Sequence, residues 1–172
     1  MAMIYNGKII TVKTDKIKFP DGHTSLYEFV LHKPAVAVVP VIDNNKILLI
    51  KQFRPVVNKK VWELPAGIID KHETPVQAAR RELEEETGLR PKKMKKIGMF
   101  YSSPGFTDEM TTLFIARDFI QTEQKFDRDE NITMKNFTIK ALLKMIKEYK
   151  FIDSKTVMGI LWTASYLSEY SG

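Results

Sequence analysis

The sequence predicts an α/β fold, in which helices cover both faces of a mixed sheet as an α/β/α sandwich, preceded by a small antiparallel sheet. Two near-continuous apolar runs, 35–42 and 46–53, are typical of strands that are buried on both faces. A strongly marked helix follows at 75–87, and two further helical patterns close the sequence. With 172 residues, of which 44% are hydrophobic, the chain is long enough for one main domain with a sizeable core.

The N-terminal part of the chain, residues 1–34, is predicted to form a β-hairpin. Its strands span 8–19 and 24–32, and the sequence Pro20-Asp21-Gly22-His23 between them is a strong turn signal. Because an isolated two-stranded hairpin is only marginally stable in water, we expect it to pack against another surface. The main domain then spans residues 35–172 and begins with the two apolar strands.

The helix at 75–87 carries clear start and stop signals. Thr74 is a suitable N-cap, Pro75 suits the first helical position, and Gln77 completes a capping box. Gly88 can adopt the left-handed conformation that ends a helix. Further strands are expected at 95–101, 110–115 and 132–137, and they precede helices at 139–149 and 154–170, whose N-caps are Thr138 and Asp153.

Four glutamates lie close together near the end of the helix at 75–87: Glu82, Glu84, Glu85 and Glu86. Like charges four residues apart destabilise a helix by about 0.2–0.5 kcal/mol per pair, and the helix dipole disfavours anions at this end. At 100° per residue, all but Glu84 fall within an arc of about 100°, and Glu84 is expected to face solvent. A bound divalent cation is the simplest way to offset the repulsion, and the alternative is a solvated acidic face.

The ligand types indicate which cation would suit the site. Three carboxylates without sulfur form a hard oxygen site, which suits Mg²⁺, with Mn²⁺ as a substitute, and argues against zinc. The sequence Leu64-Pro65-Ala66-Gly67 precedes the helix, and Gly67 permits a close approach of backbone carbonyls. Arg81 lies one turn before Glu85 and can hold it through an ion pair.

The stretch from Gly67 to Leu89, GIIDKHETPVQAARRELEEETGL, resembles the Nudix box, G-x5-E-x7-R-E-U-x-E-E-x-G-U with U a bulky aliphatic residue. Every fixed position of that pattern is met. The resemblance implies an enzyme that hydrolyses a diphosphate linked to a further moiety with the help of a divalent metal. It assigns Glu73 and Arg81 to the support of the loop and helix, and as metal ligands it implies Glu82, Glu86, Glu85 and the carbonyl of Ala66.

A proline fifteen residues after the box resembles the marker of the ADP-ribose pyrophosphatase branch of this family. This residue is Pro104, and the segments 52–55, 62–67 and 153–156 also look like that branch. The implied reaction is Mg²⁺-dependent hydrolysis of ADP-ribose to AMP and ribose 5-phosphate. Other nucleoside diphosphate sugars, such as GDP-mannose, remain alternative substrates, and a non-catalytic ADP-ribose sensor remains an alternative function.

The same resemblance implies a general base and a set of substrate-binding residues. The base would come from the acidic loop before strand 132–137, where Glu130 best matches the family position. Asp129 and Glu85 remain alternatives for the base. Arg54 ends an apolar strand, and its guanidinium suits a phosphate. The implied substrate-binding residues are Arg54, Glu109, Phe106 and Glu28.

Composition limits which partners and which location we expect for the protein. The formal net charge of +6 favours anionic substrates such as nucleotides. The lysines at 92–96 are interpreted as a solvated surface, because the aromatic pattern of an RNA-binding domain does not accompany them. The chain has no cysteine and no 18-residue apolar run, so we expect a cytoplasmic protein without a membrane or nucleic-acid partner. The resemblance implies a homodimer formed through the N-terminal strands.

Overall fold

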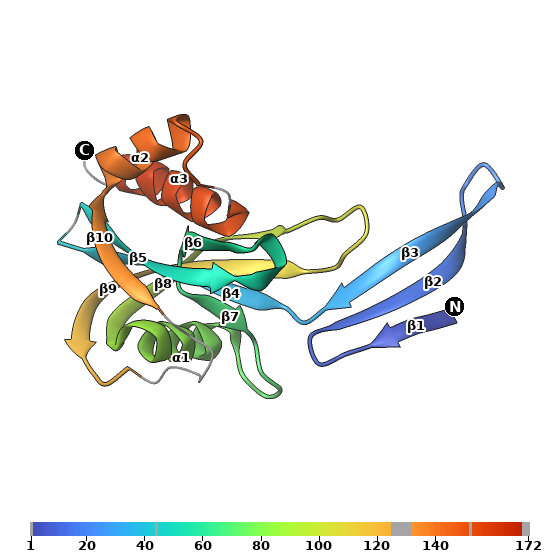
Figure 1. Cartoon of the computed structure of the whole chain (residues 1–172), viewed down its shortest axis with the longest axis horizontal. Helices are drawn as coiled ribbons and strands as arrows, with labels where there is room; N and C mark the ends of the chain where they lie inside the picture. The colour runs from blue at the N-terminus through green and yellow to red at the C-terminus, as the bar shows by residue number, and fades with distance from the viewer. Residues whose placement is uncertain (1, 44, 125–131, 152, 170–172) are drawn as a thin grey trace.

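A computed structural model of the chain, which describes residues 2–43, 45–124, 132–151 and 153–169, has the predicted α/β/α architecture with a separate small sheet (Figure 1). Three α-helices and a 3-10 turn accompany the strands in this part of the chain: α1 (Pro75–Thr87), α2 (Ile139–Lys147), α3 (Ser154–Glu169) and η1 (Pro55–Val57). The strands are β1 (Ala2–Asn6), β2 (Ile10–Lys18), β3 (Thr24–His32), β4 (Ala35–Ile42), β5 (Lys46–Arg54), β6 (Lys59–Glu63), β7 (Ala66–Ile68), β8 (Leu89–Tyr101), β9 (Met110–Gln121) and β10 (Thr133–Thr138).

The large sheet is mixed, and its strand order is β10-β5-β4-β9-β8, with β6 paired to β5 and β7 paired to β4. Strands β4 and β9 run parallel, whereas the other pairs are antiparallel. Helix α1 lies on one face and helices α2 and α3 lie on the other (Figure 1). The short strand β7 hydrogen-bonds to β4 next to α1, so the chain before the helix is held against the centre of the sheet.

Strand β4 is buried on both faces, as its apolar run predicted. Val36 and Val38 belong to the core beneath α1, where Leu83 is also fully buried. Val39 points into the opposite core, which Ile160 of α3 shares. Successive residues of a strand point to opposite faces, so one apolar run serves two cores and α1 is fixed to the sheet through one of them.

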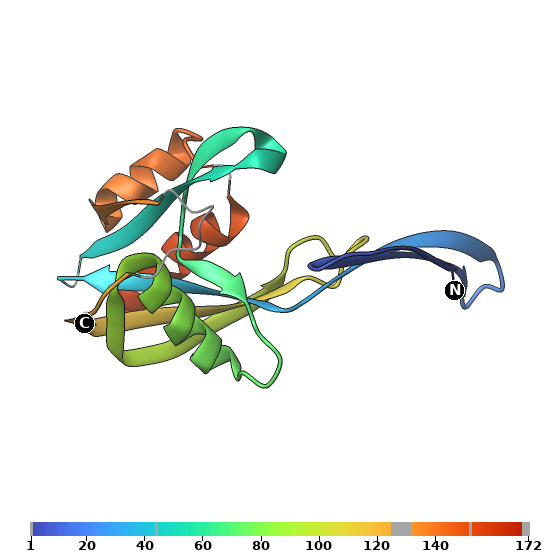
Figure 2. The same ribbon diagram turned by 60° about the horizontal axis from the view of Figure 1, so that its bottom comes forward.

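The N-terminal strands form their own antiparallel sheet, which projects away from the main domain (Figures 1 and 2). Strands β2 and β3 form the predicted hairpin, with Gly22 at a φ of 90° in the turn. Strand β1 was not predicted, because its five residues are all exposed and show no alternation of apolar and polar side chains. A hydrogen bond of 2.8 Å from the Val30 amide to the Phe106 carbonyl ties the sheet to the loop between β8 and β9.

Several predicted boundaries were wrong. Strands β8 and β9 extend well beyond 95–101 and 110–115, because they pair with each other as a long antiparallel ribbon in which exposed lysines occupy much of the edge strand β8. Strands β6 and β7 are short and lack a repeating pattern, so they were not predicted. No helix among the described residues is long and apolar enough to cross a membrane.

Candidate active site

Helix α1 begins and ends as the sequence predicted. The Thr74 amide donates to the Gln77 side chain at 2.8 Å, and the Thr74 hydroxyl accepts from the Gln77 amide at 3.4 Å, which completes the capping box. Gly88 ends the helix with a φ of 68°, and its amide donates to the Glu84 carbonyl at 2.8 Å. Both ends of the helix that carries the glutamates are therefore fixed by local sequence.

Arg81 connects the carboxylates at this site. Its Nε and Nη2 atoms donate to the two oxygens of Glu73 at 2.8 and 2.9 Å. Its Nη1 donates to Glu82 at 2.7 Å and to Glu85 at 3.1 Å, which confirms the predicted ion pair with Glu85. The hydrogen bonds that Arg81 donates to Glu73 outweigh the opposing effect of burial and raise the pKa of Arg81 far above its usual value. A protein cation thus offsets part of the repulsion along the helix.

The loop before α1 meets the remaining glutamates. Glu86 is only 3% exposed, and one of its oxygens accepts a hydrogen bond of 3.0 Å from the Ala66 amide. The Glu82 carboxylate lies so close to Gly67 that a side chain at that position would overlap it. The predicted meeting of the loop with the acidic face of α1 is therefore present in the fold.

This donor set fits a hard divalent cation. Glu82, Glu85 and Glu86 share one side of α1, where Glu86 accepts from the Ala66 amide and Glu82 lies against Gly67, which has no Cβ to displace it. Within the described residues no group of three acidic or histidine side chains already forms a coordination sphere. Glu82 and Glu85 each accept a hydrogen bond from Arg81 through one carboxylate oxygen.

Glu84 is partly buried rather than solvated, contrary to the prediction. Its oxygens accept from Arg90 at 2.7 and 2.9 Å, because β8 turns back alongside the end of the helix. A hollow of about 210 Å³ opens beside it and is lined by Arg81, Glu84, Glu85 and Glu123.

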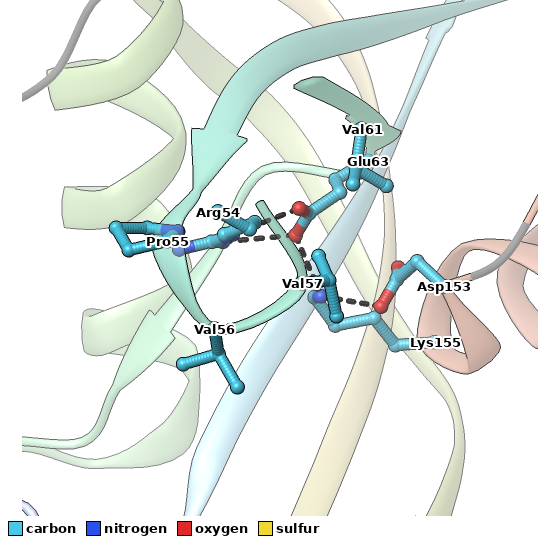
Figure 3. A pocket seen from close by; sticks show the side chains of 8 residues that line it. All are labelled: Arg54, Pro55, Val56, Val57, Val61, Glu63, Asp153 and Lys155. Atoms are coloured by element: carbon cyan, nitrogen blue, oxygen red, sulfur yellow. Dashed lines mark hydrogen bonds and ion pairs between the residues drawn. The ribbon is translucent and has the colours of Figure 1, made fainter. Parts of the chain in front are cut away.

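Arg54 lies in a second hollow, of about 320 Å³, where it forms a bidentate ion pair with Glu63 at 2.8 Å for each bond (Figure 3). This hydrogen bonding outweighs burial and raises the pKa of Arg54, and the negative charge of Glu86 adds to the effect. The Arg54 side chain is 41% exposed, so the guanidinium faces the hollow as well as Glu63.

The other predicted substrate-binding residues lie where the N-terminal sheet meets the β8–β9 loop. Glu28 and Phe106 line a common hollow of about 320 Å³ with Leu26, Tyr27 and Gly105. Glu109 lies nearby in the chain and accepts from the Ser102 hydroxyl at 2.6 Å. The structure therefore brings Glu28 and Phe106 together, apart from the hollow that holds Arg54.

Two of the candidate bases, Glu130 and Asp129, lie outside the described residues. The third, Glu85, lies on α1 with one carboxylate oxygen bonded to Arg81. Sequence reasoning missed that Glu63 binds both Arg54 and Lys155. The signal that could have pointed to this contact was the pair of segments 62–67 and 153–156, which contain Glu63 and Lys155 and share the same resemblance.

Comparisons with known proteins agree with this geometry. The NUDIX domain family matches residues 31–157. The chain is 40% identical to the ADP-ribose pyrophosphatase of Bacillus subtilis (strain 168) over 159 residues, which cover 91% of this chain and 86% of that protein. It is 38% identical to the methanol dehydrogenase activator of Bacillus methanolicus, with the same coverage of both chains. The chain therefore belongs to the Nudix family of hydrolases.

One further relative and one solved structure also resemble this chain. The ADP-ribose pyrophosphatase of Mycobacterium tuberculosis (strain ATCC 25618 / H37Rv) is 29% identical over 161 residues, which cover 92% of this chain and 78% of that protein. A crystal structure of ADP compounds hydrolase superposes with a TM-score of 0.89 over 98% of this chain and 92% of that one. At 19% identity, this last likeness shows the shared fold, including the projecting N-terminal sheet.

Proposed function

We propose that this protein hydrolyses the diphosphate bond of ADP-ribose to AMP and ribose 5-phosphate with Mg²⁺ as its cofactor. The observation that carries the proposal is the meeting of two α1 glutamates, Glu82 and Glu86, with the Ala66–Gly67 loop, in a chain that belongs to the Nudix family. The 40% identity to an ADP-ribose pyrophosphatase supports the choice of substrate.

The proposed roles follow from the positions of the side chains. Glu82, Glu86 and Glu85, with the carbonyl of Ala66, would hold the cation. When bound, Mg²⁺ would neutralise diphosphate charge and lower the pKa of a water molecule. Arg81 orients two of these carboxylates through its hydrogen bonds. Mn²⁺ is expected to substitute, because it accepts the same oxygen ligands.

The base that takes a proton from the attacking water is proposed to be Glu130, with Asp129 and Glu85 as alternatives. Arg54 would bind a phosphate through the part of its guanidinium that faces the hollow. Glu28, Phe106 and Glu109 are proposed to bind the rest of the substrate, a view supported by the shared hollow of the first two.

We further propose that the protein is a homodimer formed through its N-terminal sheet. This sheet projects from the domain and exposes large apolar side chains, among them Met3, Ile4 and Leu26. Exposed apolar patches of this kind mark protein–protein contacts. A cytoplasmic location and a small nucleotide substrate, rather than a nucleic acid, stay predictions.

The test is turnover of ADP-ribose, GDP-mannose, UDP-glucose, NADH and diadenosine polyphosphates by the wild-type protein, with and without Mg²⁺. We expect ADP-ribose to be preferred, AMP and ribose 5-phosphate to appear in equal amounts, and a chelator to stop the reaction. Preference for another compound would keep the chemistry and overturn the substrate. Binding of ADP-ribose without any turnover would favour the sensor.

A further inference from the structure

The carboxylate of Glu63 is a buried junction between two cations (Figure 3). Glu63 is 2% exposed, and both of its oxygens accept from Arg54. Oxygen Oε2 also accepts from the Nζ atom of Lys155 at 2.8 Å. Burial would raise the pKa of Glu63, but the hydrogen bonds and charges of Arg54 and Lys155 outweigh it and hold the pKa below its usual value. The carboxylate is therefore ionised and fixed from two sides.

Lys155 is itself held in place. Its Nζ atom donates to Asp153 at 2.7 Å, and Asp153 accepts from the Thr156 amide at 3.0 Å at the beginning of α3. The Thr156 hydroxyl accepts from the Leu64 amide at 2.9 Å, just before the Ala66–Gly67 loop. The start of α3 is thus bonded both to the partner of Arg54 and to the chain that approaches the α1 glutamates.

These contacts form a row of alternating charges: Arg54, Glu63, Lys155 and Asp153 (Figure 3). The negative end, Asp153, is stabilised by the N-terminus of α3, where backbone N–H groups favour anions. The positive end, Arg54, faces a hollow that the other three members of the row line as well, together with apolar side chains of Pro55, Val56, Val57 and Val61. Without Lys155, the charge of Glu63 would act on Arg54 alone and would weaken its attraction for an anion.

We propose that Lys155 is a positioning residue that acts through Glu63 to fix the guanidinium of Arg54 for the phosphate of the substrate. This inference rests on the proposed function, because it concerns how the same site binds its nucleotide. Arg54 uses Nε and Nη2 for Glu63, so Nη1 takes no part in this ion pair. Fixing one edge of a guanidinium in this way orients the other for bidentate contact with phosphate oxygens.

The kinetic test is a double-mutant cycle with Lys155→Met and Arg54→Ala. Lys155→Met is expected to raise the KM for the substrate about tenfold while changing kcat less, a size typical of coupled contacts. In the Arg54→Ala background, the same change should have no further effect, because the residue through which Lys155 acts is gone. Equal effects in both backgrounds would overturn the proposal. Lys155→Arg should restore most of the wild-type KM.

A matched control is Lys147→Met, which removes a charge from the exposed face of α2 and is expected to leave KM unchanged. If Lys155→Met folds poorly by circular dichroism, Lys155→Gln serves in its place, because its amide can still donate to Glu63. The same lack of additivity with Arg54→Ala is then expected, with a smaller rise in KM.

A second measurement does not depend on turnover. The Nε–H resonance of Arg54, assigned from its loss in Arg54→Lys, is expected to exchange slowly with solvent in the wild-type and Lys147→Met proteins and rapidly in Lys155→Met. An unchanged exchange rate in Lys155→Met would overturn the proposal. If the resonance behaves as expected but ADP-ribose is not hydrolysed, the positioning holds and the proposed function fails.

Discussion

At the scale of single residues, the glutamates of α1 depend on the guanidinium of Arg81. It bonds to Glu73, Glu82 and Glu85, and it also donates to the Ile68 carbonyl at 3.1 Å. Replacing it removes a charged donor from three carboxylates at once. We expect Arg81→Gln to lower the free energy of unfolding by about 1–3 kcal/mol, measured by urea denaturation at neutral pH. The control Arg90→Gln breaks the pair with Glu84, in which the guanidinium is exposed to solvent, and should cost less than Arg81→Gln.

The same residue sets part of the pH dependence of stability. The hydrogen bond from Arg81 lowers the pKa of Glu73 below its ordinary value of 4.5. A carboxyl whose pKa is lowered by folding stabilises the fold above its unfolded pKa, and this contribution is lost as the pH falls through the folded pKa. The wild-type protein should therefore lose stability below about pH 4.5, with a steeper slope than Arg81→Gln. Equal slopes would contradict this account.

Substitution of Gly67 tests how closely the Ala66–Gly67 loop must approach helix α1. A Cβ at this position would overlap the Glu82 carboxylate, so either the side chain or the loop must move. We expect Gly67→Ala to keep its circular dichroism spectrum and to lose about a hundredfold in turnover, the cost of a displacement of about 1 Å at a reacting centre. Near-normal turnover would show that the loop does not have to approach Glu82 so closely.

At the scale of elements, helix α1 was predictable because its signals are local. Thr74 and Gln77 form the capping box, Gly88 ends the helix, and the period of the helix places Glu82, Glu85 and Glu86 on one side. The helical period, applied to the sequence, therefore predicted which side of α1 carries most of the candidate metal ligands. Glu84 was placed wrongly, because its burial depends on Arg90 of β8, which lies beyond the end of the helix.

Contacts between distant elements were harder to predict. Glu63 on β6 and Lys155 on α3 are 92 residues apart, and nothing in either local pattern indicates the other. Strands β6 and β7 are too short to show a period, yet they place Glu63 and Ala66. Strand β1 was also missed, because its exposed residues show no alternation and its pairing with β2 decides its conformation.

At the scale of the whole molecule, the proposed dimer can be tested by a substitution in the projecting N-terminal sheet. Leu26 is 65% exposed on β3, and a lysine there should oppose burial against a second subunit. We expect Leu26→Lys to shift the protein toward the monomer in light scattering coupled to size-exclusion chromatography. Tyr149→Lys, at a side chain that is 90% exposed on the main domain, should leave the dimer intact.

Deleting residues 1–32 is a stronger version of this test. Because the sheet is proposed to be the main contact between subunits, the truncated protein is expected to be a monomer or insoluble. A well-behaved, active dimer after this deletion would contradict the proposed role of the sheet.

The central claim is that the carboxylates of α1 would hold the cation needed for water to hydrolyse ADP-ribose, and the most direct measurement is the turnover of Glu82→Gln with Mg²⁺. The account predicts a loss of about a hundredfold or more in kcat with the fold intact, since a lost ligand removes several kcal/mol of transition-state stabilisation. Glu148→Gln, on the exposed end of α2, should retain wild-type turnover. Near-normal turnover by Glu82→Gln would contradict the account.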